Sequence, residues 1–267
     1  MADPAAQLPA VQHLVVRYAK RGKMRFASHR DVARVFERGV RRAGLPIAYS
    51  AGFTPHPRIS YAGGAPTGVA SEAEYLALAL TSRQTATRVC ERLNETLPDG
   101  IDVIEVTDAA PGAQEAQGGR GGQAPSLQFA ASKWHVVLPG VEPAAAERAV
   151  AGFLALREAP VERLTDKGIR RLDARAAVVT LNVPGSADPH DGPRAVVTGF
   201  EDCVTLRMVI LHTAPAVRPD DVLTALGAQY GLVPSVPPII TRLAQGSLAL
   251  LAGETVLWRQ CCGAGEP

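Results

Sequence analysis

A segment of low sequence complexity divides the chain into two parts. Residues 110–126, APGAQEAQGGRGGQAPS, consist mainly of Gly, Ala and Gln. Such a composition cannot supply a hydrophobic core and favours a flexible linker. The flanking parts, of about 110 and about 140 residues, each have the size of a typical domain. We therefore predict one domain over residues 10–109, a linker over 110–126, a second domain over 127–258 and a tail over 259–267.

Capping signals define a helix in the first part. Ser28, followed three residues later by Asp31, is a capping-box pattern that favours a helix beginning at Ser28. Gly44 and Pro46 then end this helix near Ala43, because Gly favours a left-handed cap and Pro cannot continue a helix. The other elements that we expect are strands over residues 13–22, 46–50, 72–80 and 101–109 and a second helix over residues 82–100.

The second part repeats this order more loosely. The elements that we expect there are a strand over residues 132–140, a helix over 142–158, a hairpin of 172–184 with 201–213, a helix over 218–231 and a terminal extended stretch. Both parts read β-α-β-β-α-β, which is the order of the ferredoxin-like split unit. We predict an α+β protein built from two tandem ferredoxin-like units.

Positive charge is concentrated in one early segment. The whole chain carries a net charge of +2, whereas residues 17–58 carry eleven Lys or Arg against Asp31 and Glu37, a net charge of +9. These basic residues are Arg17, Lys20, Arg21, Lys23, Arg25, Arg30, Arg34, Arg38, Arg41, Arg42 and Arg58. Such an uneven distribution favours a surface that faces a polyanion.

Arginines gather on one face of the predicted helix. At about 100° per residue, the side chains that fall within about 120° of arc are Arg30, Arg34, Arg38, Arg41 and Arg42. A solvated helix face usually mixes charges of both signs, and few carboxylates interrupt this one. We predict that the face binds phosphate, assisted by Lys23 and Arg25 just upstream. An ordinary solvated face is the alternative.

Two prolines bracket His56 in the segment SAGFTPHPRIS, residues 50–60, and stiffen its backbone. Phe53 adds a flat apolar surface and Arg58 a charge, so the segment could stack a base and hold its phosphate. It could equally be a rigid connector in which His56 bonds to backbone. His29, in the first helical turn, can pack against the sheet or address an anion at the helix N-terminus.

The cysteines indicate no redox centre in this chain. Cys90 and Cys203 lie in apolar contexts, so we expect both to be buried as small hydrophobic residues. The sequence has neither a CxxC motif nor a three-cysteine cluster pattern. The adjacent Cys261 and Cys262 could bind a soft metal or belong to a flexible tail. His29 and His56 lack a ligand partner three or four residues away, so we predict no metal and no other cofactor.

The sequence shows no membrane or export signal. No apolar run approaches the roughly 20 residues that cross a bilayer. The N-terminal MADPAAQLPAVQ has no basic region followed by an apolar stretch. We therefore expect a cytoplasmic protein without a membrane partner.

Two long strings resemble a known bacterial family. Residues 22–78, GKMRFASHRDVARVFERGVRRAGLPIAYSAGFTPHPRISYAGGAPTGVASEAEYLAL, are similar to the signature of the radical-SAM-linked, or radical-SAM-associated, proteins, a domain of unknown function. TDKGIRRLDARAAVVTLNV, residues 165–183, resembles the weaker second signature, in which Asp173 and Arg175 would form a structural pair or a domain-interface contact. The resemblance implies a partner: members are fused to, or encoded beside, a cobalamin-binding radical SAM protein, often near genes for an E/G-type ribonuclease and large-subunit ribosomal proteins. It implies no catalytic residues.

Three functions follow from these observations. We favour an RNA-binding accessory protein that presents substrate to a separately encoded radical SAM partner in RNA modification. A metal-independent ribonuclease is the second, because tandem ferredoxin-like units also form CRISPR repeat-processing nucleases; His56 or His29 would then be the catalytic candidates. The third is a protein-interaction scaffold in which the basic face docks an acidic partner.

Overall fold

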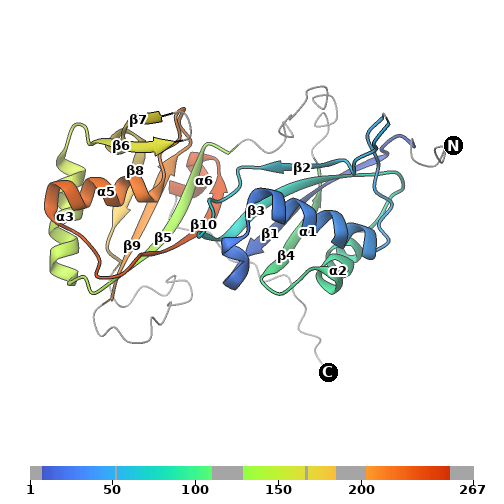
Figure 1. Cartoon of the computed structure of the whole chain (residues 1–267), viewed down its shortest axis with the longest axis horizontal. Coiled ribbons are helices and arrows are strands. Elements are labelled where there is room, and N and C mark those ends of the chain that lie inside the picture. Colours follow the sequence, from blue (N-terminus) through green and yellow to red (C-terminus); the bar gives the residue numbers. More distant parts are fainter. Residues whose placement is uncertain (1–7, 52, 110–128, 166–167, 185–202, 253–267) are drawn as a thin grey trace. The chain divides into compact units, whose positions relative to one another are not determined.

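The structure is a computed structural model that describes residues 8–51, 53–109, 129–165, 168–184 and 203–252. The chain divides into two compact units, which contain the described residues 8–109 and 129–252 respectively (Figure 1). The predicted linker and the predicted tail lie outside the described residues. No helix in the described part of the chain is long and apolar enough to cross a membrane.

The first unit is a sheet with two helices. Its elements are β1 (Gln12–Lys20), the short 3-10 helix η2 (Gly22–Phe26), α1 (His29–Arg42), β2 (Ile59–Ala62), β3 (Ala70–Leu80), α2 (Ala86–Thr96) and β4 (Ile101–Asp108). The strand order in the sheet is β4-β1-β3-β2, and every neighbouring pair is antiparallel. The first strand therefore lies inside the sheet, beside the third and fourth.

Alternation along β1 decides which sheet face the helices cover. Leu14, Val16 and Tyr18 are buried with Phe36 of α1 and Leu93 of α2 in one hydrophobic core. The Tyr18 and Phe36 rings meet edge to face, with centroids 4.6 Å apart. Since this face of the helix is buried in the core, the opposite face of α1 points to solvent (Figure 1).

The second unit has a similar plan with an insertion. Its elements are β5 (Ala131–Pro139), α3 (Pro143–Ala155), β6 (Pro160–Thr165), β7 (Gly168–Asp173), α4 (Ala174–Ala177), β8 (Val178–Asn182), β9 (Cys203–Leu211), α5 (Pro219–Tyr230), β10 (Ile239–Gly246) and α6 (Leu248–Ala252). The sheet order is β10-β5-β9-β8, again antiparallel throughout. β6 and β7 form a separate two-stranded hairpin.

The α+β class is confirmed, and two predicted elements are corrected. The strand predicted over residues 172–184 is divided, because Leu172 and Asp173 belong to β7, residues 174–177 form α4, and the strand β8 is Val178–Asn182. The segment predicted as a strand over residues 46–50 forms only isolated bridges, between Ile47 and Leu80 and between Tyr49 and Pro57; the strand β2 lies later, at Ile59–Ala62. The β6–β7 hairpin was not predicted, because five of its twelve strand residues are charged and its apolar residues do not alternate with polar ones. That each unit is ferredoxin-like stays a prediction.

Asp173 and Arg175, from the second signature, have local structural roles. The Asp173 carboxylate caps α4 by accepting from the backbone N–H of Arg175 at 3.0 Å, and it also accepts from Ala159 N–H at 2.8 Å. The Arg175 guanidinium donates to the carbonyl of Val178 at 3.0 Å and to the carbonyl of Leu154. Both residues thus hold the second unit together by backbone contacts.

Candidate nucleic-acid interface

The capping box that begins α1 is formed as predicted. Asp31 N–H donates to Ser28 Oγ at 3.3 Å, and Ser28 N–H donates to Asp31 Oδ2 at 3.2 Å. The Ser28 hydroxyl also donates to that oxygen at 2.6 Å, and these hydrogen bonds lower the pKa of Asp31, with a smaller contribution from the charge of Arg34. At the other end, Gly44 adopts the left-handed conformation, φ 59°, that ends the helix. The carboxylate of Asp31 is therefore committed to the cap.

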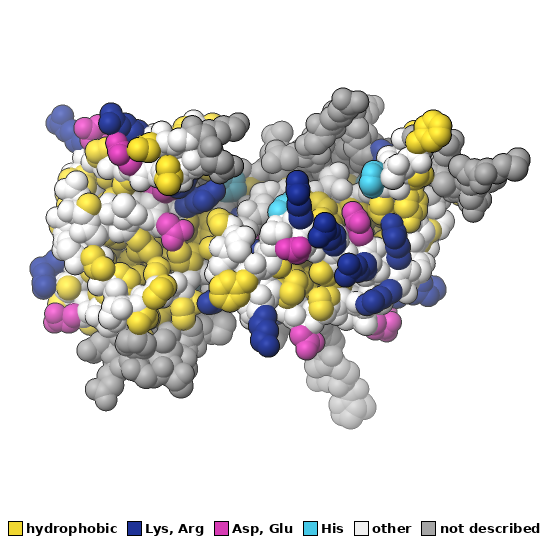
Figure 2. Space-filling view, viewed as in Figure 1, with side chains coloured by type: hydrophobic (Ala, Val, Ile, Leu, Met, Phe, Trp, Pro, Cys, Tyr) yellow, Lys and Arg dark blue, Asp and Glu magenta, His cyan; other side chains and the backbone are white. Residues whose placement is uncertain are grey.

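The arginines of α1 are exposed and largely unneutralised. The exposed ones are Arg30, Arg34, Arg38, Arg41 and Arg42. Arg34 Nη1 lies 3.9 Å from Asp31 Oδ1, in a pair whose side chains are 67% and 55% exposed and therefore weakly coupled. Within the described ranges, the other four form no ion pair. Figure 2 shows Lys and Arg side chains gathered over α1, with few acidic ones between them.

The short helix η2 extends this surface and adds an aromatic ring. Lys23 is exposed and Arg25 half-buried, and the Phe26 side chain is 59% exposed. The Arg25 Cζ lies 4.6 Å from the centroid of the Phe26 ring, a cation–π contact. Phe26 was not among the predicted site residues. The sequence signal that could have indicated Phe26 is its place between two arginines, Arg25 and Arg30.

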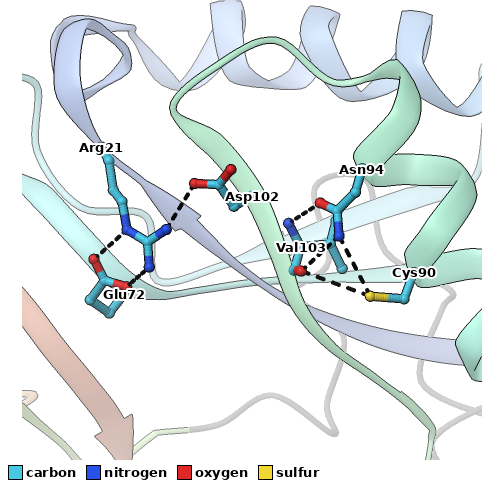
Figure 3. A network of polar contacts seen from close by, with 6 residues as sticks. All are labelled: Arg21, Glu72, Cys90, Asn94, Asp102 and Val103. Atoms are coloured by element: carbon cyan, nitrogen blue, oxygen red, sulfur yellow. Dashed lines mark hydrogen bonds and ion pairs between the residues drawn. The ribbon is translucent and has the colours of Figure 1, made fainter. Parts of the chain in front are cut away.

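Arg21 fixes the position of η2. Its guanidinium donates to Glu72 Oε1 at 2.7 Å, to Glu72 Oε2, and to Asp102 Oδ2 at 2.9 Å (Figure 3). The hydrogen bond to Glu72 is the largest cause that raises the pKa of Arg21. The Arg21 N–H also donates to Gly100 O at 2.8 Å. The start of η2 is thus tied to β3 and to β4.

Figure 3 also shows how α2 is attached to β4. The Asn94 side chain accepts from Val103 N–H at 2.7 Å and donates to Val103 O at 3.0 Å. Cys90 lies beside the same carbonyl, with its sulfur 3.8 Å from Val103 O. Of the two cysteines expected to be buried, Cys90 is half-buried against the core. Cys203, the first residue of β9, is exposed, so that expectation is wrong for Cys203.

Lys20, which contributes to the charge of the basic segment, is not on its surface. The side chain is buried, 3% exposed, and Nζ donates to Ala65 O at 3.2 Å and to Pro66 O at 3.4 Å. Glu74, equally buried, accepts from Ala65 N–H at 3.1 Å. These two charged residues hold the loop that follows β2. The +9 of the segment therefore overstates the charge available to a ligand.

His29 has a packing contact at the start of α1. Its ring meets the Tyr61 ring edge to face at 5.3 Å between centroids. A Cβ added at Gly64 would lie 3.4 Å from His29 Cδ2, so the loop after β2 also approaches this ring. Tyr61 is half-buried, and burial, with the charge of Glu37, raises the pKa of its hydroxyl. The sequence left two roles open for His29, packing and anion binding. The contact with Tyr61 supports the packing role.

The segment that carries Phe53 and His56 is closed at its base. Ser50 N–H donates to His56 O at 2.9 Å, and His56 N–H donates to Ser50 Oγ at 3.0 Å. Tyr49 and Pro57 form the bridge below them. The imidazole of His56 and the ring of Phe53 are both exposed, Phe53 to 110% of its reference value. The segment therefore has features of both alternatives: its base is held by backbone hydrogen bonds, and the ring of Phe53 projects into solvent.

Arg58 is not brought to the arginines of α1. Ile59 and Tyr61 pack on the core that the helices cover, so Arg58, one residue before Ile59, points to the opposite face of the sheet. Burial is the main cause that lowers the pKa of His13 on β1, and the charge of Arg58 on that face lowers it further. The structure separates Arg58 from the phosphate-binding group that the sequence predicts.

The described residues contain no cluster of three or more His, Cys, Asp or Glu side chains placed to hold a metal ion. Cys261 and Cys262, for which metal binding was one alternative, lie outside the described residues.

These features define an α+β protein whose first unit carries a cation-rich helix, preceded in the chain by the exposed Phe26 and followed by the exposed Phe53. A family model described as "Uncharacterized protein conserved in bacteria (DUF2344)" matches residues 13–219, and the chain belongs to this family. No curated protein matches the sequence.

Two solved structures show limited similarity. A chain from the "Crystal Structure of a Cbf5-Nop10-Gar1 Complex" is 12% identical with a TM-score of 0.45, covering 94% of this chain and 59% of that one. This protein therefore spans less than two thirds of that neighbour. The dye-decolorizing protein from V. cholerae is 10% identical with a TM-score of 0.20, covering 90% and 94% of the two chains.

Proposed function

We propose that this protein binds RNA through α1 and presents it to a separately encoded radical SAM protein that modifies RNA. The observation that carries the RNA-binding proposal is the row of exposed arginines on α1, of which only Arg34 has a carboxylate partner within the described residues. The radical SAM partnership rests on the resemblance of residues 22–78 to the radical-SAM-linked proteins.

The spacing of the arginines suits a phosphodiester strand. Arg30, Arg34 and Arg38 follow one another at four-residue intervals, which corresponds to about 6 Å of rise per step along the helix. Each guanidinium can donate two parallel hydrogen bonds to a phosphate. A row of such groups favours a chain of phosphates over a single small anion.

We further assign both units to the ferredoxin-like fold. In each unit the first strand lies between the third and the fourth, and the second strand lies at the edge beside the third. This is the arrangement of a β-α-β-β-α-β split unit, with β6, β7 and α4 inserted into the second copy. The fold supports many functions, so the function is argued from α1 alone.

The test is RNA binding by a charge-reversed protein. In the double variant Arg34→Glu/Arg38→Glu, we expect affinity for a short labelled RNA to fall by at least about tenfold, because two contacts are lost and two repulsions gained. The matched control reverses two exposed arginines of the second unit, Arg148→Glu/Arg157→Glu, which keeps the change in net charge the same. The proposal would be refuted if both variants lost the same amount of RNA affinity, or if neither variant lost any. Cleavage of the RNA would indicate a ribonuclease instead.

A further inference from the structure

We infer that the RNA bound by this surface is single-stranded, with bases stacked on Phe26 and Phe53 and phosphates along α1. The inference rests on the proposed function and specifies its ligand. Its evidence is independent of the arginines. It consists of the exposure of two aromatic side chains, the hydrogen bonds that support their segments, and their positions relative to α1.

The ring of Phe26 is exposed on a fixed backbone. It is 59% exposed, and η2 is anchored by Arg21 through Glu72 and Asp102. Arg25 lies against the ring at 4.6 Å. Since the supporting backbone is held in place, the ring can accept a base with little further ordering.

The ring of Phe53 projects from the other supported segment. Its exposure of 110% means that nothing in the described structure packs on it. The Ser50–His56 hydrogen bonds and the Tyr49–Pro57 bridge close the base of the loop. An apolar ring held away from the core in this way is costly in water and suits a ligand with a flat apolar face.

The two rings lie toward opposite ends of α1. Phe26 precedes the helix, beside the end of the sheet where Lys20 pairs with Ser71. The Phe53 segment follows the helix, and it leaves the sheet near the end where Ile47 bridges Leu80 (Figure 1). α1 has fourteen residues and is about 21 Å long. A strand that reaches both rings therefore passes along the arginine row.

This arrangement favours unpaired bases over a duplex. In double-stranded RNA the base faces are stacked on one another and hidden from protein side chains, so two exposed phenyl rings gain nothing from it. In a single strand every base has a free face that can stack on an aromatic ring regardless of sequence. The arginines then contact the phosphates between the stacked bases.

The experiment compares an unstructured oligouridine with a perfectly paired RNA duplex of the same length. We expect the wild-type protein to bind the oligouridine at least about tenfold more tightly. The double variant Phe26→Leu/Phe53→Leu keeps an apolar side chain but removes both rings, and it should lose about tenfold in affinity for the oligouridine with duplex binding unchanged. Leu164→Ala, at an 80% exposed residue of β6, is the control for shortening an exposed apolar side chain elsewhere in the protein, and it should leave oligouridine affinity unchanged.

The outcomes separate this inference from the proposed function. If the Phe variant binds oligouridine like wild type, or if wild type binds the duplex equally well, the stacking inference is wrong while RNA binding through α1 stands. If wild type binds neither RNA, both proposals fail. Thermal unfolding of the Phe variant confirms that it is folded, which is expected because both rings are exposed.

Discussion

Arg21 and Glu72 join the end of one strand to its neighbour, with Arg21 Nε donating to Glu72 Oε1 at 2.7 Å. Asp102 accepts from the same guanidinium on the β4 side. Arg21, which directly precedes η2, thus stabilises the first unit and is not available to a ligand. The basic segment therefore has two kinds of cation: those that hold the fold and those that face solvent.

Removing the Arg21 guanidinium should loosen η2. We expect Arg21→Met to lower the free energy of unfolding by about 1 kcal/mol, because the ion pairs are partly exposed but form a small network. The variant should also weaken RNA binding several-fold by displacing Phe26 and Arg25. Urea denaturation and RNA titration measure the two effects. Arg83→Met, at an exposed arginine without a carboxylate partner in the described residues, should leave both unchanged.

Gly100 holds the same region from the β4 side. Its φ is 88°, and an added Cβ would lie 2.6 Å from the backbone oxygen of Arg21. We expect Gly100→Ala to cost about 2–3 kcal/mol, since it combines a left-handed backbone with a clash against backbone. Gly68→Ala is the control, because Gly68 has a similar φ of 92° and nothing within 4 Å of its added Cβ. Equal losses from the two substitutions would show that the contact with Arg21 is unimportant.

The β6–β7 hairpin is attached to α5 by a buried ion pair. Arg163 Nη1 lies 2.6 Å from Asp221 Oδ2, and their side chains are 19% and 5% exposed. Asp221→Ala leaves Arg163 without its carboxylate and should destabilise the second unit by about 3 kcal/mol. Glu162→Gln, which breaks the exposed Glu162–Arg171 pair of the same hairpin, should cost less than about 0.5 kcal/mol. Thermal unfolding distinguishes them; a smaller loss for Asp221→Ala than for Glu162→Gln would be inconsistent with this structure.

Two histidines should make stability depend on pH. Burial is the main cause that lowers the pKa of His13 and of His212, assisted by the charges of Arg58 and Arg242 respectively. The unfolded chain, with a pKa near 6.5 for each, then binds protons more readily than the folded chain. The free energy of unfolding should therefore fall as the pH drops below about 6.5.

The control is removal of the titrating groups. His13→Gln and His212→Gln should each remove part of the decrease below about pH 6.5, and the double variant should remove more than either single substitution. Denaturation curves at several pH values measure the effect. A decrease of undiminished size in the double variant would show that other groups cause it. His212 also accepts from, or donates to, Ser132 Oγ at 2.6 Å, so the single His212 variant should lose some stability at every pH.

Local signals made part of the fold predictable. The ends of α1 are determined locally, by the side chains of Ser28 and Asp31 and by the backbone preference of Gly44. The helix accordingly has the predicted boundaries within one residue. β2 could not be located in the same way. Residues 46–50 have strand-forming composition, but the pairing with β3 is made by Ile59 and Tyr61, a choice set by the whole sheet.

The candidate site shows the same division. The exposure of the α1 arginines follows from helix periodicity, which the sequence displays. The burial of Lys20 depends on carbonyl groups of residues 65 and 66, and the orientation of Arg58 depends on the register of β2 against β3. The burial of Lys20 and the orientation of Arg58 both depend on contacts between segments that are distant in the sequence. Composition and residue spacing do not predict such contacts.

The salt dependence of RNA binding tests the central claim most directly. If four arginines, Arg30, Arg34, Arg38 and Arg41, each neutralise a phosphate of a single strand, the logarithm of the association constant should fall with the logarithm of salt concentration with a slope of about −3. The neutral variant Arg34→Ala/Arg38→Ala should halve that slope. A wild-type slope near zero, or the same slope in wild type and variant, would contradict the assignment of α1 as the RNA-binding surface.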